Sequence, residues 1–118
     1  MRHTAMALLL GFLGTLASAC GSSGMTEEES CRELVSLQCN KTYSCGDLAA
    51  LAVFGAGHSS VADCITNESA ICSMNICYTS GLHYQSSQAS RCIADTDALS
   101  CTDFIGHYVA ASCASVCK

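Results

Sequence analysis

The stretch "TEEESCRELVSLQCNKTYSC", residues 26–45, decides the fold of this chain because it carries the local signals of one long helix. Thr26 followed three residues later by Glu29 is a capping-box pattern. Three glutamates fall in the first turn, where the helix dipole favours negative charge. Cysteine and aliphatic side chains then recur at helical spacing, at Cys31, Leu34, Val35 and Cys39. The stretch predicts a helix that begins after Thr26 and is closed by Gly46.

Four later segments repeat these helical signals, and they cover residues 47–54, 59–72, 86–101 and 102–118. Asp47 is a possible N-cap for the first of them, and Ser60 with Asp63 repeats a capping pattern in the second. Ser86 or Ser87 is expected to cap the third.

The last segment is expected to bury one face made of Phe104, Tyr108 and Val109, and the longest loop is expected between Cys77 and Ser86. Proline is absent, and the alternating runs of Val, Ile and Thr that mark strands do not occur. The sequence therefore predicts an all-α domain of about four to five short helices.

The chain has 118 residues and 11 cysteines, an odd number that needs an explanation in an exported protein. Ten of them are expected to pair as disulfides: Cys31, Cys39, Cys45, Cys64, Cys72, Cys77, Cys92, Cys101, Cys113 and Cys117. The chain has only seven aromatic residues and no Trp, so the apolar core is thin. Small domains with thin cores are commonly held together by disulfides in oxidising compartments.

A weak internal repeat runs through these cysteines. Cys31, Cys39 and Cys45 recur with nearly the same spacing as Cys64, Cys72 and Cys77, and Cys92 with Cys101 repeats the first part. The pattern predicts stacked helical hairpins.

Helix geometry limits how the repeat can pair. Residues eight apart on a helix are separated by about 12 Å along its axis, whereas a disulfide needs Cα atoms within about 7 Å. Cys31 is therefore not expected to pair with Cys39, nor Cys64 with Cys72. Each helix is expected to be joined at its two ends to different neighbours, and the rest of the connectivity stays open.

The N-terminus has the pattern of a secretory signal peptide. Arg2 and His3 precede an apolar run over residues 5–17, which is shorter than the roughly 20 residues that span a bilayer. Small residues, Ala17-Ser18-Ala19, follow before Cys20. We expect a signal peptide over residues 1–19, a Gly/Ser tether over 20–25 and a cysteine-rich helical domain over 26–118.

The stretch "LASAC", residues 16–20, resembles the lipobox of bacterial lipoproteins, with Leu16 one residue ahead of the usual Leu position. The resemblance implies that Cys20 is the lipid-attachment residue, which also accounts for the odd cysteine. It implies a bacterial cell-envelope protein, anchored by its N-terminal lipid at the outer membrane or cell surface. The alternative is cleavage at the same A-x-A site by ordinary signal peptidase, which would release a secreted protein.

A second resemblance covers most of residues 31–117. The pattern Cys31-x7-Cys39-x5-Cys45, followed by "FGAG" and then Asp63-Cys64-x7-Cys72, is similar to that of uncharacterised small cysteine-rich bacterial lipoproteins. This resemblance implies no particular activity.

Metal sites and nucleic-acid binding are not expected. The chain has a formal net charge of −5, and nucleic-acid binding requires a basic patch, which so acidic a chain is not expected to form. The spacings Cys72-x4-Cys77 and Cys113-x3-Cys117 come closest to a zinc pattern, and Met74 adds a soft ligand for Cu(I). An oxidising compartment favours disulfides around a packed Met74 instead. We therefore expect no metal and no cofactor.

Catalysis is not expected either. His58 lies beside Ser59 and Ser60, but serines at this place are better explained as helix caps, and no G-x-S-x-G motif occurs. His83 and His107 have no partner at a suggestive spacing. The sequence favours a non-enzymatic, lipid-anchored binding or interaction module at the cell surface, with an unknown protein or ligand as its partner. The alternative is a soluble secreted cysteine-rich effector or inhibitor.

Overall fold

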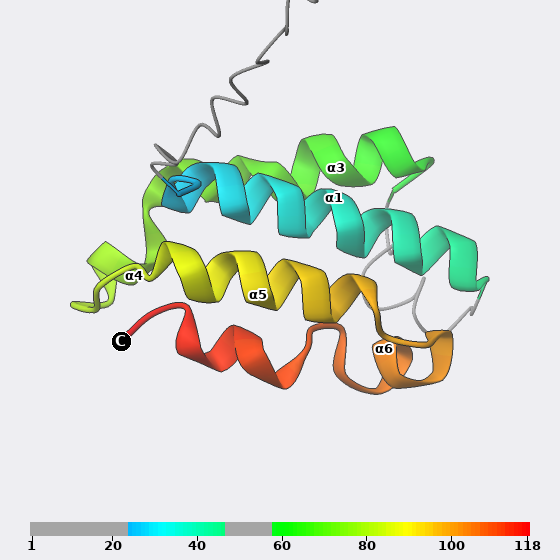
Figure 1. Ribbon diagram of the computed structural model, residues 1–118. Helices are drawn as coiled ribbons and strands as arrows, with labels where there is room; N and C mark the ends of the chain where they lie inside the picture. Colours follow the sequence, from blue (N-terminus) through cyan, green and yellow to red (C-terminus); the bar gives the residue numbers. More distant parts are fainter. Residues whose placement is uncertain (1–23, 47–57) are drawn as a thin grey trace, which may run out of the picture.

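The computed structural model describes residues 24–46 and 58–118 (Figure 1). The expected signal peptide, Cys20 and the predicted helix that begins at Asp47 lie outside the described residues. The described elements are α1 (Glu27–Cys45), α3 (Val61–Glu68), the 3₁₀-helix η1 (Ser69–Met74), α4 (Ile76–Thr79), α5 (Ser86–Asp97), α6 (Cys101–His107) and the 3₁₀-helix η2 (Ala111–Ser115).

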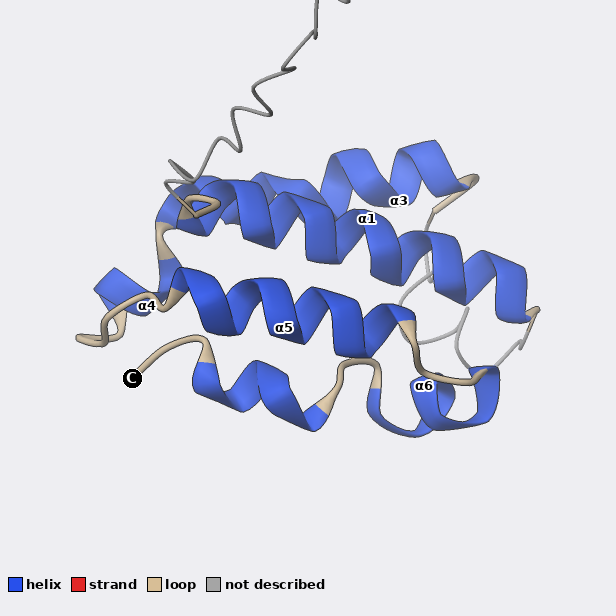
Figure 2. Cartoon of the chain, viewed as in Figure 1, coloured by secondary structure: helices blue, strands red, loops and turns tan. Residues whose placement is uncertain are grey.

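The described part of the chain is all-helical, as predicted (Figure 2). Within residues 24–46 and 58–118 the single β feature is an isolated antiparallel bridge between Tyr84 and Cys117. The helices lie side by side. α1 packs against α3 and η1 on one side and against α5 on the other, and η2 packs on the far side of α5. α4 and α6 lie at opposite ends of this stack (Figure 1).

Helix α1 forms as its sequence predicts. The Thr26 hydroxyl accepts a hydrogen bond from the Glu29 amide at 3.2 Å, and the Glu29 carboxylate accepts one from the Thr26 amide at 2.8 Å. This reciprocal capping box satisfies two backbone donors at the start of the helix. Gly46 ends α1 in the left-handed region at φ 65°, where glycine has no steric cost.

All ten cysteines of the described chain are paired, in the disulfides Cys31–Cys72, Cys39–Cys64, Cys45–Cys101, Cys77–Cys117 and Cys92–Cys113. The two pairings that helix geometry forbids are absent among them. The repeats pair in antiparallel order, first cysteine with second and second with first, and the third cysteine of each repeat bonds to the C-terminal part. The expectation that each helix is joined to different neighbours is wrong in one respect. Both Cys31 and Cys39 join α1 to the same α3–η1 segment, because that segment runs antiparallel alongside it.

The core is small and rich in sulfur. One cluster joins Val35 and Cys39 of α1 to Cys64 of α3 and Cys72 of η1, with Val61 and Ile65 packed around it. Most of the large, fully buried side chains are half-cystines. The largest fully buried side chain is Phe104. Disulfides therefore supply much of the stability that a larger apolar core would give, and each contributes about 2–4 kcal/mol to the free energy of unfolding.

Several predicted boundaries are wrong. Gln85, and not Ser86 or Ser87, occupies the N-cap position of α5, and Ser86 is its first helical residue. The second predicted segment changes from α-helix to 3₁₀-helix after Glu68. A four-residue helix, α4, occupies part of the predicted loop.

The last predicted segment is also divided. Tyr108 adopts φ 60° and ends α6, so the chain continues separately as η2. Phe104 is fully buried, as expected, but Tyr108 and Val109 are only half-buried.

Candidate functional site

One end of the helical stack exposes large apolar side chains. They are Ile71, Met74, Ile76, Tyr78 and Leu82, of which Tyr78 is 81% exposed and Met74 61%. We call these five residues the apolar end. Single exposed apolar side chains are ordinary on a protein surface, whereas five within twelve consecutive residues make this end a candidate interaction surface.

Backbone geometry keeps these side chains outward. Asn75 separates η1 from α4 in a left-handed conformation at φ 48°, and Gly81 reverses the chain at φ 73°. The intervening α4 has only four residues, of which Cys77 alone is buried. Met74 is the last residue of η1, directly before this turn, and it is 61% exposed, so the expectation of a packed Met74 is wrong.

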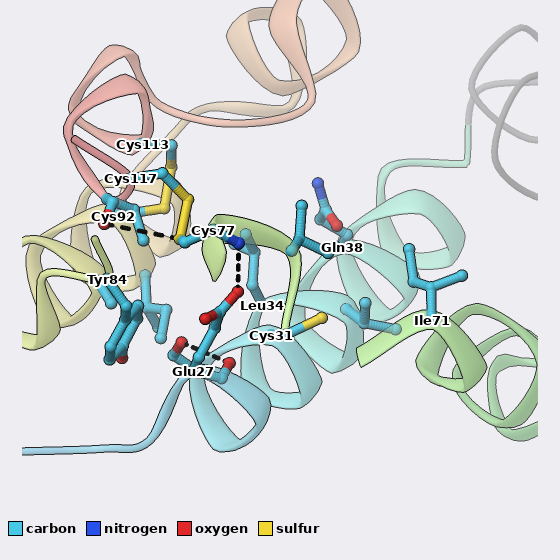
Figure 3. A pocket seen from close by; sticks show the side chains of 16 residues that line it. Glu27, Cys31, Leu34, Gln38, Ile71, Cys77, Tyr84, Cys92, Cys113 and Cys117 are labelled. Carbon is cyan, nitrogen blue, oxygen red and sulfur yellow. Dashed lines mark hydrogen bonds between the residues drawn. A yellow bond between two sulfur atoms is a disulfide. The ribbon is translucent and has the colours of Figure 1, made fainter. Parts of the chain in front are cut away.

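A cavity of about 280 Å³ lies beside the apolar end, between α1, η1, α4, α5 and η2 (Figure 3). Its aliphatic walls are Leu34, Val35, Ile71, Ile76, Ala89, Ile93 and Val116. Ile71 and Ile76 belong both to the cavity wall and to the exposed apolar end. The cavity therefore connects the interior of the domain with its apolar surface.

Disulfides hold the walls of this cavity. Three of them contribute half-cystines to its lining: Cys31–Cys72, Cys77–Cys117 and Cys92–Cys113. They tie α1 to η1, α4 to the C-terminal segment after η2, and α5 to η2. A site whose walls are already fixed loses little conformational entropy when a ligand binds.

The polar side chains in the wall are engaged by the chain itself. The Glu27 carboxylate accepts a hydrogen bond from the Cys77 amide at 2.6 Å, and the Ser30 hydroxyl donates to the Glu27 carbonyl at 3.0 Å. Gln38 donates to the Tyr108 carbonyl at 3.1 Å, and the Tyr84 hydroxyl donates to the Met25 carbonyl at 2.9 Å. The cavity therefore presents mainly hydrocarbon and sulfur to an occupant.

His58 is held by carboxylates of α3. Its Nε2 lies 2.9 Å from Glu68 Oε1 and its Nδ1 lies 3.8 Å from Asp63 Oδ2, with 11% of the side chain exposed. Ser60 caps α3 by accepting from the Asp63 amide at 3.1 Å. The Asp63 carboxylate accepts from the Ser59 amide at 2.9 Å, which lowers the pKa of that carboxyl. Both serines thus act at the helix start, as the sequence predicts.

The other two histidines lie on separate elements. The His83 amide donates to the Lys118 carbonyl at 2.6 Å, as part of the short pairing between the loop after α4 and the C-terminal segment. His107 ends α6 and lines a wider hollow of about 720 Å³ together with Asp103. The Asp103 carboxylate already accepts from the Ser100 hydroxyl at 2.8 Å.

Residues 24–46 and 58–118 contain no group of three or more His, Cys, Asp or Glu placed to hold a metal ion. None of the helices described there is long and apolar enough to cross a bilayer.

Sequence reasoning missed the cavity and the apolar end. A signal for the apolar end was present, because residues 69–90 contain no Asp, Glu, Lys or Arg. The cavity left no local signal, since its walls come from five elements. No protein-family model matches this chain, and none of the curated proteins or solved structures compared with it matches significantly.

Proposed function

We propose that this chain is an exported, lipid-anchored binding module of the bacterial cell surface, and that its site is the apolar cavity beside the apolar end. The observation that carries the proposal is an apolar cavity whose walls are fixed by disulfides and continue into exposed apolar side chains. The five disulfides indicate an oxidising, extracytoplasmic location. The lipobox resemblance at Cys20 supports the anchor.

The geometry favours binding over catalysis. The polar side chains of the cavity wall already have hydrogen-bond partners within the chain, so they are poorly placed to act on a substrate. A cavity of this size takes one apolar group, such as a large aliphatic side chain or a short hydrocarbon segment. Burying one such group stabilises a complex by about 1.5–3 kcal/mol.

Filling the cavity tests the proposal. Val116 lines the cavity and is half-buried, so Val116→Phe places a larger side chain there while its backbone keeps its place. Val109→Phe is the matched control, because Val109 is also half-buried but lines the separate hollow beside His107. The probe is an uncharged naphthalene dye whose emission rises in apolar surroundings, titrated against the oxidised mature chain.

We expect the dye to bind the parent chain and the Val109→Phe control, and to lose at least about tenfold in affinity, or about 1.4 kcal/mol, in Val116→Phe. Circular dichroism spectra establish that both variants keep the parent helicity. Equal dye affinity in all three proteins would contradict the proposal.

A further inference from the structure

We propose that the apolar end is a membrane-contact surface, which rests against the interfacial region of the bilayer that holds the Cys20 anchor. This inference rests on the proposed function, because it takes the anchor as given. It goes further by assigning the exposed residues Ile71, Met74, Ile76, Tyr78 and Leu82 to a lipid partner.

The described chain begins at the apolar end. The Met25 carbonyl accepts a hydrogen bond from Tyr84, two residues beyond Leu82, and Glu27 accepts from the Cys77 amide within α4. Figure 1 shows the start of α1 and α4 at the same end of the stack, with α6 at the other. A tether at the N-terminus therefore pulls on the apolar end and not on the α6 end.

The length of chain before this point limits its distance from the membrane. Cys20 precedes Gly24 by four residues, which span at most about 14 Å when fully extended. A domain anchored through Cys20 thus keeps its apolar end within that distance of the lipid surface. At such a short tether length, even a weak surface contact is favoured by the high effective concentration of lipid.

The chemistry of the apolar end fits a neutral lipid interface. Tyr side chains concentrate at membrane interfaces because they are apolar with one polar tip, and Tyr78 is the most exposed of the five residues. No Asp, Glu, Lys or Arg occurs in residues 69–90. The contact therefore depends on apolar burial and does not require anionic lipid, in keeping with a net charge of −5.

The three glutamates in the first turn of α1 lie at this end of the stack, and each has a partner within the chain. Glu27 accepts from the Cys77 amide, Glu28 pairs with Arg32 at 2.7 Å, and Glu29 closes the capping box of α1. The Arg32 guanidinium offsets the charge of Glu28, whereas Glu27 and Glu29 bond to neutral amides and keep their charge. Apolar burial must therefore exceed the repulsion between these two carboxylates and lipid phosphates.

Depth-dependent quenching tests the proposal. The chain has no Trp, so Tyr78→Trp gives a single reporter at the apolar end and Thr102→Trp gives a matched exposed reporter on α6. The mature oxidised chain, residues 20–118, is coupled through the Cys20 thiol to a maleimide lipid in phosphatidylcholine vesicles. The same vesicles are prepared with and without acyl-brominated phosphatidylcholine, whose bromines quench indole emission at short range.

An interfacial apolar surface lies about 5–10 Å into the boundary between headgroups and acyl chains. We therefore expect the Tyr78→Trp emission to fall by about half in brominated vesicles and to shift to the blue, as expected for burial at that depth. The Thr102→Trp emission is expected to stay unchanged. Equal emission of both reporters in the two kinds of vesicle would overturn the proposal.

Two features keep the outcomes distinct. Chemical coupling supplies the anchor, so a failure of quenching leaves the question of lipidation in the cell untouched. A second copy of the chain is the competing occupant. Light scattering that shows a lipid-free dimer, with dimerisation lost in Ile76→Ser and no quenching in vesicles, would also overturn the membrane proposal.

Discussion

The two ends of the helical stack are each crossed by a disulfide, yet Phe104 at one end is buried whereas Tyr78 at the other is exposed. At the α6 end, Phe104 is fully buried, 5.7 Å from the ring of Tyr108, with the Lys41 ammonium 6.0 Å from its centroid. At the α4 end, Tyr78 is 81% exposed. Cys45–Cys101 lies at the first end and Cys77–Cys117 at the second.

The difference shows that an end held by a disulfide can stay folded without burying all of its apolar side chains. The α6 end is closed by packing as well as by its cross-link, and Lys41 adds a bond to the Leu99 carbonyl at 2.9 Å. The α4 end is closed by its cross-link, a few backbone hydrogen bonds and the hydrogen bonds of Glu27 and Tyr84, so its exposed apolar side chains need not be buried for the fold to hold. They remain available for a partner.

The largest expected contrast comes from truncating one aromatic residue at each end. Phe104→Ala is expected to lower the free energy of unfolding by about 3–5 kcal/mol, because it leaves a cavity in a packed site. Tyr78→Ala is expected to change it by less than about 0.5 kcal/mol, as for other exposed positions. Urea unfolding of the oxidised proteins measures both, and similar losses would break the comparison.

Removing each cross-link sharpens the same contrast. Cys77→Ala with Cys117→Ala, and Cys45→Ala with Cys101→Ala, are each expected to cost about 2–4 kcal/mol. Only the first pair of changes should speed amide exchange locally, at Gln85 and Lys118, whose amides bond to Val116 and His83 across the α4 end. The second pair of changes should leave the Tyr108 amide protected from exchange by its hydrogen bond to the Phe104 carbonyl. Exchange followed by NMR decides this, and faster exchange at Tyr108 alone would contradict it.

Helix caps provide a smaller and more even comparison. Thr26 caps α1 near the apolar end, and Ser100 caps α6 by accepting from the Asp103 amide at 3.1 Å. Thr26→Ala and Ser100→Ala are each expected to cost about 1 kcal/mol. Caps act locally, so the two losses should be alike despite the different burial of the ends. A loss at one end only, in matched thermal or urea unfolding, would count against this account.

Acid gives the smallest effect. The Thr26 amide lowers the pKa of Glu29 below its ordinary value of 4.5, and the Ser59 amide lowers the pKa of Asp63 below 3.8. Each carboxylate stabilises the fold above its ordinary pKa, and this contribution is lost as pH falls through the lowered value. Urea midpoints should therefore fall between about pH 6 and about pH 3, and Glu29→Gln should make the fall shallower. An identical slope in parent and variant would show that Glu29 has no share in it.

Local signals in the sequence predicted much of the fold. The capping boxes and the helical spacing of cysteines placed α1 and α3, and helix rise alone excluded Cys31–Cys39 and Cys64–Cys72. The signals failed where tertiary structure overrides propensity. Tyr108 ends α6 in a left-handed conformation that no residue type announced, and 3₁₀ geometry replaces α-helix after Glu68.

The site was less predictable than the fold. The cavity exists because cysteines far apart in sequence bring five elements together, and a single sequence does not fix that connectivity. The apolar end was partly predictable, because residues 69–90 contain no Asp, Glu, Lys or Arg, but the neighbouring cysteines favoured a packed Met74 instead.

The central claim is that this oxidised domain is anchored beside its apolar end, and the intact mass of the mature protein from its own membranes tests it most directly. The account predicts a chain that begins at Cys20 and carries acyl groups. Reduction should add one hydrogen atom for each of the ten cysteines paired in the structure. A lipid-free mass beginning at Cys20, with the protein in the culture medium, would contradict the anchor and favour a secreted effector or inhibitor.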